Sequence, residues 1–319
     1  MTSKVPERIV SLLPAATEMV FALGCGERLV GRSHACDHPW AALPTPAVTR
    51  ATVSPKASST ELHQAVTTSA QTGKSLFEID RDRLRALRPD LILTQDQCAV
   101  CAVSPADLEA ALADWPGPRP QVIRLSPSRL ADLWTDFRQV ASALSLADEG
   151  RSVIGPLKAR VVAVIERVAL LRWRPTVACL EWLDPLMGAG NWIPELVELA
   201  GGRPLFGEAG KHSDWMTWEN LLLQDPEVIV ALPCGFDLDR VRQEVSILAR
   251  QPGWERLRAV RSGQLFVTDA SAYFNRPGPR LVDSLEILAE ILHPESFSPA
   301  RYRGEGWQAW TESKPGGPR

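Results

Sequence analysis

The sequence lacks the features that mark nucleic-acid-binding and membrane-spanning chains. Lysine and arginine are scattered without a run, and the net charge is −3, so no basic surface for a nucleic acid is expected. No stretch approaches the roughly 20 apolar residues that a membrane span requires. We therefore expect a chain that is not membrane-embedded and does not bind nucleic acid.

Signatures of common enzyme classes are also missing. The sequence has no Gly-x-Ser-x-Gly, no Gly-x-x-x-x-Gly-Lys, no His-Glu-x-x-His and no Gly-x-Gly-x-x-Gly after a strand. Asp37, Glu181 and Asp184 offer carboxylates for acid–base work, but none has a partner at a diagnostic spacing. These absences predict a non-catalytic protein.

No secretion signal is evident in the first residues. Met-Thr-Ser-Lys-Val-Pro-Glu-Arg leads directly into a strand-like run over residues 9–13, without an apolar segment or a small-residue cleavage site. We therefore expect a cytoplasmic protein. In a reducing compartment the six cysteines are expected to be thiols or metal ligands rather than disulfides.

Short apolar runs alternate with helical stretches along most of the chain. Strands are predicted over residues 29–33, 91–95, 121–125, 175–180, 228–232 and 264–269, and helices over 14–23, 194–200 and 280–292. Residues 129–171 are expected to be helical, with interruptions near Gly150 and Pro156. The alternation predicts an α/β fold with parallel sheets.

An internal repeat indicates two related lobes. Residues 82–93, DRLRALRPDLIL, match residues 219–230, ENLLLQDPEVIV, in the first acid, a leucine, the proline, the second acid and the strand. A weaker echo links residues 18–24 with 195–201. We predict α/β lobes over residues 1–147 and 174–295, a connecting helix over 148–173 and an irregular tail over 296–319.

These motifs give the chain a resemblance to a known family. The resemblance covers roughly residues 8–293. Its motifs are the run RIVSLLPAATE (residues 8–18), the paired Leu-x-Pro-acid segments, Pro252-Gly-Trp with Leu257-Arg-Ala-Val, and Arg276-Pro-Gly-Pro-Arg. The sequence resembles the helical-backbone substrate-binding proteins of cobalamin and iron-siderophore importers, in particular the cobalamin-binding branch.

The resemblance implies the class III periplasmic-binding-protein fold, in which one long helix joins two Rossmann-like lobes. It also implies an interlobe cleft for a metal chelate, and contact of Asp82 and Glu219 with an importer permease. The alternative for both acids is placement in a first helical turn, where a carboxylate is favoured by the helix dipole.

Cysteine and histidine gather after two predicted strands of the first lobe. Cys98-Ala-Val-Cys101 follows the strand over 91–95, and Ser33-His34-Ala-Cys36-Asp-His38 follows the strand over 29–33. Cys36, Cys98, Cys101 and either His34 or His38 would suit zinc or an iron–sulfur cluster. Alternatively, these cysteines are small buried hydrophobes, or one imidazole or thiol binds the metal of a chelate. A thiol-dependent enzyme or a redox or metal sensor is the competing functional interpretation.

Aromatic loops mark the second lobe. The chain has eleven tryptophans but two tyrosines, and several tryptophans follow strands or precede helices, where ligands bind in α/β proteins. With Pro14 and His34 of the first lobe, the predicted ligand contacts are Trp182, Trp192, Trp215, Trp218, Cys234, Tyr273, Asn275 and Arg276. Core packing is the alternative for each tryptophan. We predict that the protein binds cobalamin, another corrinoid or a related tetrapyrrole or metal chelate.

Overall fold

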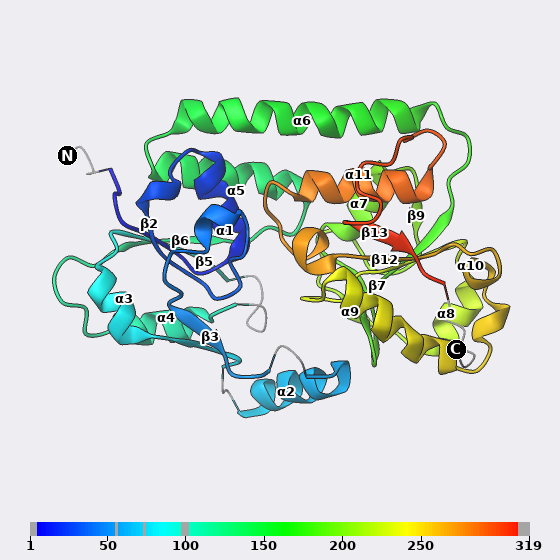
Figure 1. Cartoon of the computed structure of the whole chain (residues 1–319), viewed down its shortest axis with the longest axis horizontal. Helices are drawn as coiled ribbons and strands as arrows, with labels where there is room; N and C mark the ends of the chain where they lie inside the picture. The colour runs from blue at the N-terminus through cyan, green and yellow to red at the C-terminus, as the bar shows by residue number, and fades with distance from the viewer. Residues whose placement is uncertain (1–4, 55–56, 73–74, 97–101, 312–319) are drawn as a thin grey trace, which may run out of the picture. The chain divides into compact units, whose positions relative to one another are not determined.

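The computed structural model describes residues 5–54, 57–72, 75–96 and 102–311 (Figure 1). The chain divides into two compact units. Unit 1 comprises Met1–Pro127, Ala131–Lys158 and Pro277–Pro279, and unit 2 comprises Ser128–Leu130, Ala159–Arg276 and Arg280–Arg319. Within the described ranges, no helix has both the length and the apolar character that crossing a bilayer demands.

Unit 1 is built on a four-stranded parallel sheet with the strand order β2-β1-β5-β6. Its strands are β1 (Ile9–Ser11), β2 (Leu29–Arg32), β5 (Leu91–Gln95) and β6 (Gln121–Leu125), and its helices include α1 (Pro14–Ala22), α3 (Arg81–Leu87), α4 (Pro105–Leu112) and α5 (Leu130–Ala143). Every residue of β1 and β5 is buried, as expected for central strands covered on both faces. Val10, Ile92 and Leu108 lie in one apolar cluster that packs α4 against the sheet.

An excursion from unit 1, which we did not predict, follows β2. It consists of β3 (Thr49–Ala51), α2 (Ser59–Thr72) and β4 (Phe77–Ile79), and β3 and β4 pair as a two-stranded antiparallel ribbon. Phe77 and Ile79 pack against the core cluster of unit 1, so the ribbon is anchored to the unit. The helix α2 lies beyond the ribbon, at the outer end of the excursion (Figure 1).

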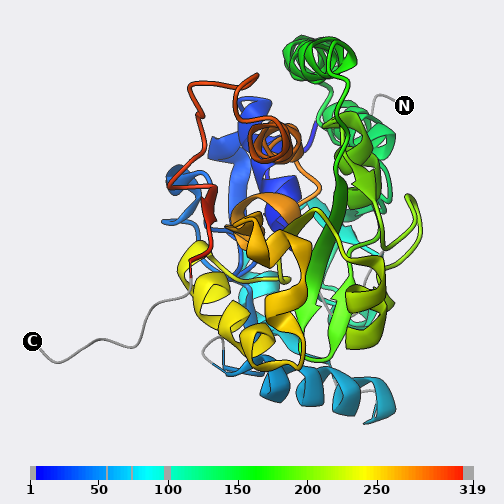
Figure 2. The same cartoon turned by 90° about the vertical axis from the view of Figure 1, so that its right-hand side faces the viewer.

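Unit 2 contains a mixed sheet with the order β10-β8-β7-β11-β12-β13, and β9 also pairs with β7. Its strands are β7 (Thr176–Leu183), β8 (Leu186–Gly188), β9 (Arg203–Pro204), β10 (Asp214–Trp215), β11 (Val228–Ala231), β12 (Leu265–Thr268) and β13 (Trp307–Ala309). Its helices include α7 (Ile193–Leu199), α8 (Trp218–Gln224), α9 (Leu238–Glu244), α10 (Arg258–Arg261) and α11 (Leu281–Leu292), and helices lie on both sides of the sheet (Figure 2). The three central strands β7, β11 and β12 are parallel, as predicted. The antiparallel strands at both edges were not predicted.

The long helix α6 (Ala147–Ala169) contributes residues to both units. Its 23 residues correspond to roughly 35 Å at the usual helical rise. The predicted interruptions near Gly150 and Pro156 are wrong, because the helix runs through both residues. Pro156 is exposed, so water can reach the backbone groups that a proline leaves without a helical partner.

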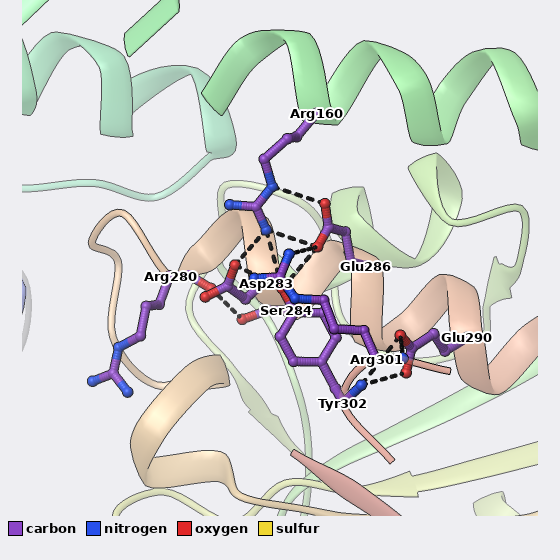
Figure 3. Close-up of polar contacts among 8 residues, drawn as sticks. All are labelled: Arg160, Arg280, Asp283, Ser284, Glu286, Glu290, Arg301 and Tyr302. Atoms are coloured by element: carbon purple, nitrogen blue, oxygen red, sulfur yellow. Dashed lines mark hydrogen bonds and ion pairs between the residues drawn. The ribbon is translucent and has the colours of Figure 1, made fainter. Parts of the chain in front are cut away.

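A polar network within unit 2 fixes α6 to α11 and to the C-terminal segment (Figure 3). Arg160 donates to Glu286 from Nε over 2.8 Å, and its Nη2 pairs with Asp283. The hydroxyl oxygen of Tyr302 lies 2.9 Å from Asp283 Oδ1 and 2.8 Å from Glu286 Oε2. These hydrogen bonds raise the pKa of Arg160, so the guanidinium stays charged.

The C-terminal segment is more regular than predicted. Instead of an irregular tail, the structure has β13, which pairs antiparallel with β12 from Phe266 to Thr268. The buried Glu290 of α11 accepts the indole N–H of Trp307 over 2.8 Å and the backbone N–H of Arg301 over 2.6 Å. The prediction failed because this strand is only three residues long and is stabilised by side chains distant in sequence.

The helices of the two repeat copies, α3 and α8, begin and end in the same way. Asp80 and Thr217 are the N-cap residues of α3 and α8, and each side chain accepts a backbone N–H three residues later, over 2.9 and 3.2 Å. Arg88 and Asp225 then adopt the left-handed conformation, with φ of 43° and 40°. The two copies therefore correspond in backbone conformation as well as in sequence. Both have a residue other than glycine in the left-handed conformation, where glycine is usual.

The acid after the proline has the same role in both copies. Asp90 accepts the backbone N–H groups of Glu7 and Arg8 over 3.0 and 2.9 Å, next to β1. Glu227 accepts the backbone N–H of Thr176, the first residue of β7, over 2.8 Å. Each acid thus lies just before one strand and binds the start of the neighbouring strand.

Replacing Asp90 by alanine should therefore destabilise the protein. The variant leaves two backbone N–H groups without their carboxylate, and we expect the free energy of unfolding to fall by about 1–2 kcal/mol. Urea unfolding followed by circular dichroism measures the change. Asp114→Ala, at an exposed position just after α4, is the matched control and should change stability by less than about 0.5 kcal/mol. Equal stability of the two variants would contradict the anchoring role.

Asp136 is a buried acid of α5 in unit 1 without full hydrogen bonding. It is 6% exposed, and its Oδ2 has no hydrogen-bond partner among the described residues. Burial raises the pKa of Asp136 to about 7, and the negative charges of Asp132 and Asp96 act in the same direction. The backbone N–H of Ser126 opposes them by favouring the carboxylate.

Because folding raises this pKa, the folded protein holds a proton that the unfolded chain releases between about pH 4 and 7. The contribution of Asp136 to stability is therefore present at low pH and is lost as the pH rises to about 7. Asp136→Asn should be more stable than the wild type at pH 8, on the order of 3 kcal/mol, with the difference vanishing near pH 4. Urea unfolding at several pH values tests this, and a variant that is less stable at pH 8 would contradict it.

Candidate functional site

In unit 1 the parallel strands end at a small cavity. Pro14, His34, Thr49 and Phe77 are among the residues that line it, and its volume of about 20 Å³ has room for roughly one water molecule. Pro14 begins α1 directly after β1, and His34 follows β2. The structure thus brings the two predicted ligand residues of unit 1 to one cavity, at the sheet edge where α/β proteins bind ligands.

His34 is held in place by its neighbours. Its Nδ1 lies 2.8 Å from the hydroxyl oxygen of Thr49, which also accepts the backbone N–H of His34 over 3.0 Å. The ring lies 5.5 Å from that of Phe77, between centroids. Burial lowers the pKa of His34, and the charge of Arg32 lowers it further. The imidazole is therefore neutral at physiological pH, the form in which a ring nitrogen binds a metal.

The predicted protein-bound metal site is not supported. Cys36 is fully buried, and its Sγ lies 3.0 Å from the hydroxyl of Thr17, so this thiol belongs to the interior of unit 1. Cys98 and Cys101 fall outside the described residues. Within the part of the chain that the structure describes, no group of three or more histidine, cysteine, aspartate or glutamate side chains could hold a metal ion.

In unit 2, the loops after β7 and β11 lie together. Trp182, near the end of β7, packs against Phe236 with ring centroids 5.3 Å apart and donates its indole N–H to the carbonyl of Asp184 over 3.0 Å. The backbone N–H of Cys234 donates to the carbonyl of Glu181 over 3.1 Å. The thiol of Cys234 is partly exposed and forms no disulfide.

The loop after β12 completes this group. Asn275 Oδ1 accepts the backbone N–H of Gly235 over 3.3 Å and so joins the β12 loop to the β11 loop. Arg276 is 7% exposed, and its Nη2 lies 3.4 Å from the hydroxyl of Ser271. Tyr273 lies 5.6 Å from the guanidinium of Arg280, and burial raises its pKa, so the phenol stays protonated. Three strand ends of unit 2 therefore contribute aromatic and polar side chains to one edge of the sheet.

The remaining predicted tryptophans lie elsewhere. Trp192 is 6% exposed and donates its indole N–H to the carbonyl of Phe274 over 2.9 Å, beneath the β12 loop. Trp218 stacks on Trp254 at 6.3 Å and donates to a backbone carbonyl. Trp215 is 57% exposed on the edge strand β10. The contacts of Trp192 and Trp218 favour packing roles within unit 2.

Sequence reasoning missed Arg240, which lies beside this edge. Arg240 of α9 lies with its guanidinium 3.5 Å from the centre of the Phe236 ring, and burial lowers its pKa. Phe236 thus stands between Trp182 and Arg240. Asp237 is the N-cap residue of α9, directly after the β11 loop. Aspartate at this position is a sequence signal for the start of a helix, and that helix carries Arg240.

The two predicted docking acids occupy equivalent places. Asp82 lies in the first turn of α3 and Glu219 in the first turn of α8. This placement agrees with the helix-dipole alternative. Leu223, one turn after Glu219, is 81% exposed.

Comparisons with known proteins agree with this architecture. The model of a family described as periplasmic binding protein matches residues 9–272. A vitamin B12-binding protein of Pectobacterium atrosepticum is 25% identical over 93% of this chain and 92% of its own. An uncharacterized ABC transporter substrate-binding lipoprotein of Bacillus subtilis is 21% identical over 92% of this chain and 82% of its own. The crystal structure of a periplasmic heme-binding protein from Pseudomonas aeruginosa is 22% identical, with a TM-score of 0.69 over 91% of this chain and 94% of that one.

The comparisons confirm the predicted fold and the non-catalytic character, because the relatives are substrate-binding proteins rather than enzymes. The prediction of a cytoplasmic protein is wrong, since the relatives are periplasmic proteins or lipoproteins, which act outside the cytoplasm. That prediction relied on the first eight residues of the sequence. The chain belongs to the periplasmic binding protein family.

Proposed function

We propose that this protein is the extracytoplasmic corrinoid-binding component of an ABC importer. The observation that carries the proposal is the similarity, over nearly the full length of both chains, to vitamin B12-binding proteins. Asp82 and Glu219, in matching helical turns of the two repeats, are the proposed contacts with the permease.

The strand-end residues of unit 2 suit the periphery of a corrinoid. The macrocycle is a flat apolar surface edged by amide arms. Trp182, which packs on the buried Phe236, offers an aromatic face, and the amide of Asn275 lies in the adjoining loop for hydrogen bonding. Tyr273 and Arg276 supply further donors from the turn after β12. Such a mixture of aromatic surface and a few placed polar groups is typical of small-molecule sites.

In unit 1, His34 suits the metal of the chelate. Its imidazole is neutral, Nδ1 is occupied by Thr49, and the side chain is only partly buried. Nε2 is then the nitrogen available to a cobalt ion. We propose His34 as an axial ligand of a corrinoid whose lower coordination site is open.

Binding of corrinoids is the direct test. Cobinamide and cobalamin should each stabilise the purified protein against heat, by about 2.7 kcal/mol at a ligand concentration one hundred times Kd. Differential scanning fluorimetry and absorbance titration measure this. Stabilisation by heme or a ferric hydroxamate but by no corrinoid would contradict the ligand assignment and leave the binding-protein role intact.

Axial ligation predicts a spectral change that depends on His34. Aquocobinamide should show a shifted visible band on binding to the wild type, because imidazole replaces water on cobalt, and His34→Ala should lose that shift. His63→Ala, which changes a histidine of α2 that does not line the cavity, is the matched control and should keep it. Loss of the shift in both variants, or in neither, would contradict the role of His34.

A further inference from the structure

Exposed apolar side chains gather at the C-terminal end of α6 and in the loop that follows it, within unit 2. Eight large hydrophobic residues of the described chain are exposed, and four of them lie within residues 162–173. These four are Val162, Ile165, Leu170 and Trp173, which are 49, 38, 84 and 52% exposed. Exposed hydrophobic residues are normal when they are scattered singly, whereas a group of them marks an interaction site. We call these four residues the apolar patch.

Packing within unit 2 is carried by other residues of the helix. The residues that bury this part of α6 form a set with helical spacing, Val161, Val164 and Val168, and all three are buried. The last of them lies beside Gly201 of unit 2. No described helix or strand of unit 2 lies over the outer side of α6 (Figures 1 and 2). Packing inside the unit therefore does not account for the apolar patch.

Trp173 is fixed in its exposed position. Its ring meets the ring of the buried His293 edge-on, with the centroids 6.0 Å apart and the planes at 90°. The contact covers one side of the indole, and half of the side chain remains in contact with solvent. A tryptophan with one end packed and the other exposed is typical of residues at an interface between apolar and aqueous surroundings.

The charges beside the apolar patch are positive. Arg172 and Arg174 flank Trp173 in sequence, both are exposed, and neither forms an ion pair with another described residue. Arg167, in the last turn of α6, is also exposed. Residues 162–174 contain these three arginines and one acid, Glu166, so the segment has a net charge of +2 in a chain whose net charge is −3. An apolar surface bordered by unpaired guanidinium groups complements an anionic surface.

The size of the apolar patch favours a lipid surface over a second copy of the chain. The exposed parts of its four side chains amount to about 400 Å², half of the roughly 800 Å² that each partner of a stable protein complex buries. Binding to a bilayer has no such minimum area, because it strengthens with apolar area and with attraction to anionic lipids together.

We propose that the apolar patch and its arginines bind the surface of a bilayer that contains anionic lipids. Leu170 and Trp173 enter the interfacial layer, where indole rings are favoured. Arg172 and Arg174 contact the lipid phosphates. The protein thereby lies on the membrane surface without crossing it. The inference is independent of the ligand that the protein carries.

Vesicle flotation tests the inference. The wild type should float with vesicles of phosphatidylcholine and phosphatidylglycerol, and bind vesicles of phosphatidylcholine alone about tenfold more weakly. Leu170→Ser/Trp173→Ser removes apolar area, and Arg172→Gln/Arg174→Gln removes charge, so each variant should bind the mixed vesicles about tenfold more weakly than the wild type. Added salt should weaken binding of the wild type but have little effect on the arginine variant.

Matched controls lie elsewhere in unit 2. Leu223→Ser changes a leucine of α8 that is 81% exposed, and Arg250→Gln/Arg261→Gln removes two exposed arginines outside residues 162–174. Both controls should bind the mixed vesicles as the wild type does. Circular dichroism should show the same thermal unfolding for all variants, because the altered side chains are exposed.

The outcomes separate this inference from the proposed function. Failure of the wild type to bind the mixed vesicles, or equal binding by the wild type and both patch variants, overturns the membrane contact. A wild-type dimer in analytical ultracentrifugation that Leu170→Ser/Trp173→Ser converts to a monomer, without vesicle binding, assigns the apolar patch to a second copy and also overturns it. Corrinoid binding is measured separately, and its absence overturns the proposed function alone.

Discussion

The carboxylate that follows the seven-residue helix of each repeat fixes the first strand of each large sheet. Asp90 binds the backbone next to β1, and Glu227 binds the first residue of β7. Because β1 and β7 are central strands, their positions determine where the neighbouring parallel strands end. Those strand ends carry His34 in unit 1 and Trp182, Cys234 and Asn275 in unit 2, so the positions of these side chains depend on the backbone hydrogen bonds that the two carboxylates accept.

Much of the framework was predictable because local sequence and tertiary structure agree there. The strands β5 and β6 begin and end at the predicted residues, and the helix at Pro14 begins where a proline without a donor N–H is tolerated. The repeat also predicted equivalent helices and strands. The edge strands β8, β10 and β13 and the ribbon β3–β4 escaped prediction, because segments of two or three residues have too little periodicity and depend on partners distant in sequence.

The candidate site was predicted less completely. Pro14 and His34 do share a cavity, and Trp182, Cys234, Tyr273, Asn275 and Arg276 come from the three strand ends of unit 2. Residue type could not separate these from Trp192 and Trp218, whose indole N–H groups are satisfied inside unit 2. Residue type was also insufficient for Cys36, which is close to His34 in sequence but lies buried against Thr17. Arg240 and Phe77 were missed because their contributions depend on ring contacts that spacing does not encode.

We propose a corrinoid, rather than heme or a siderophore, as the ligand of this protein. Native mass spectrometry of the protein with equimolar cobalamin, heme and a ferric hydroxamate tests it most directly, because the three ligands compete in one sample. We predict one corrinoid per chain as the dominant complex. A dominant heme or hydroxamate complex would contradict the claim.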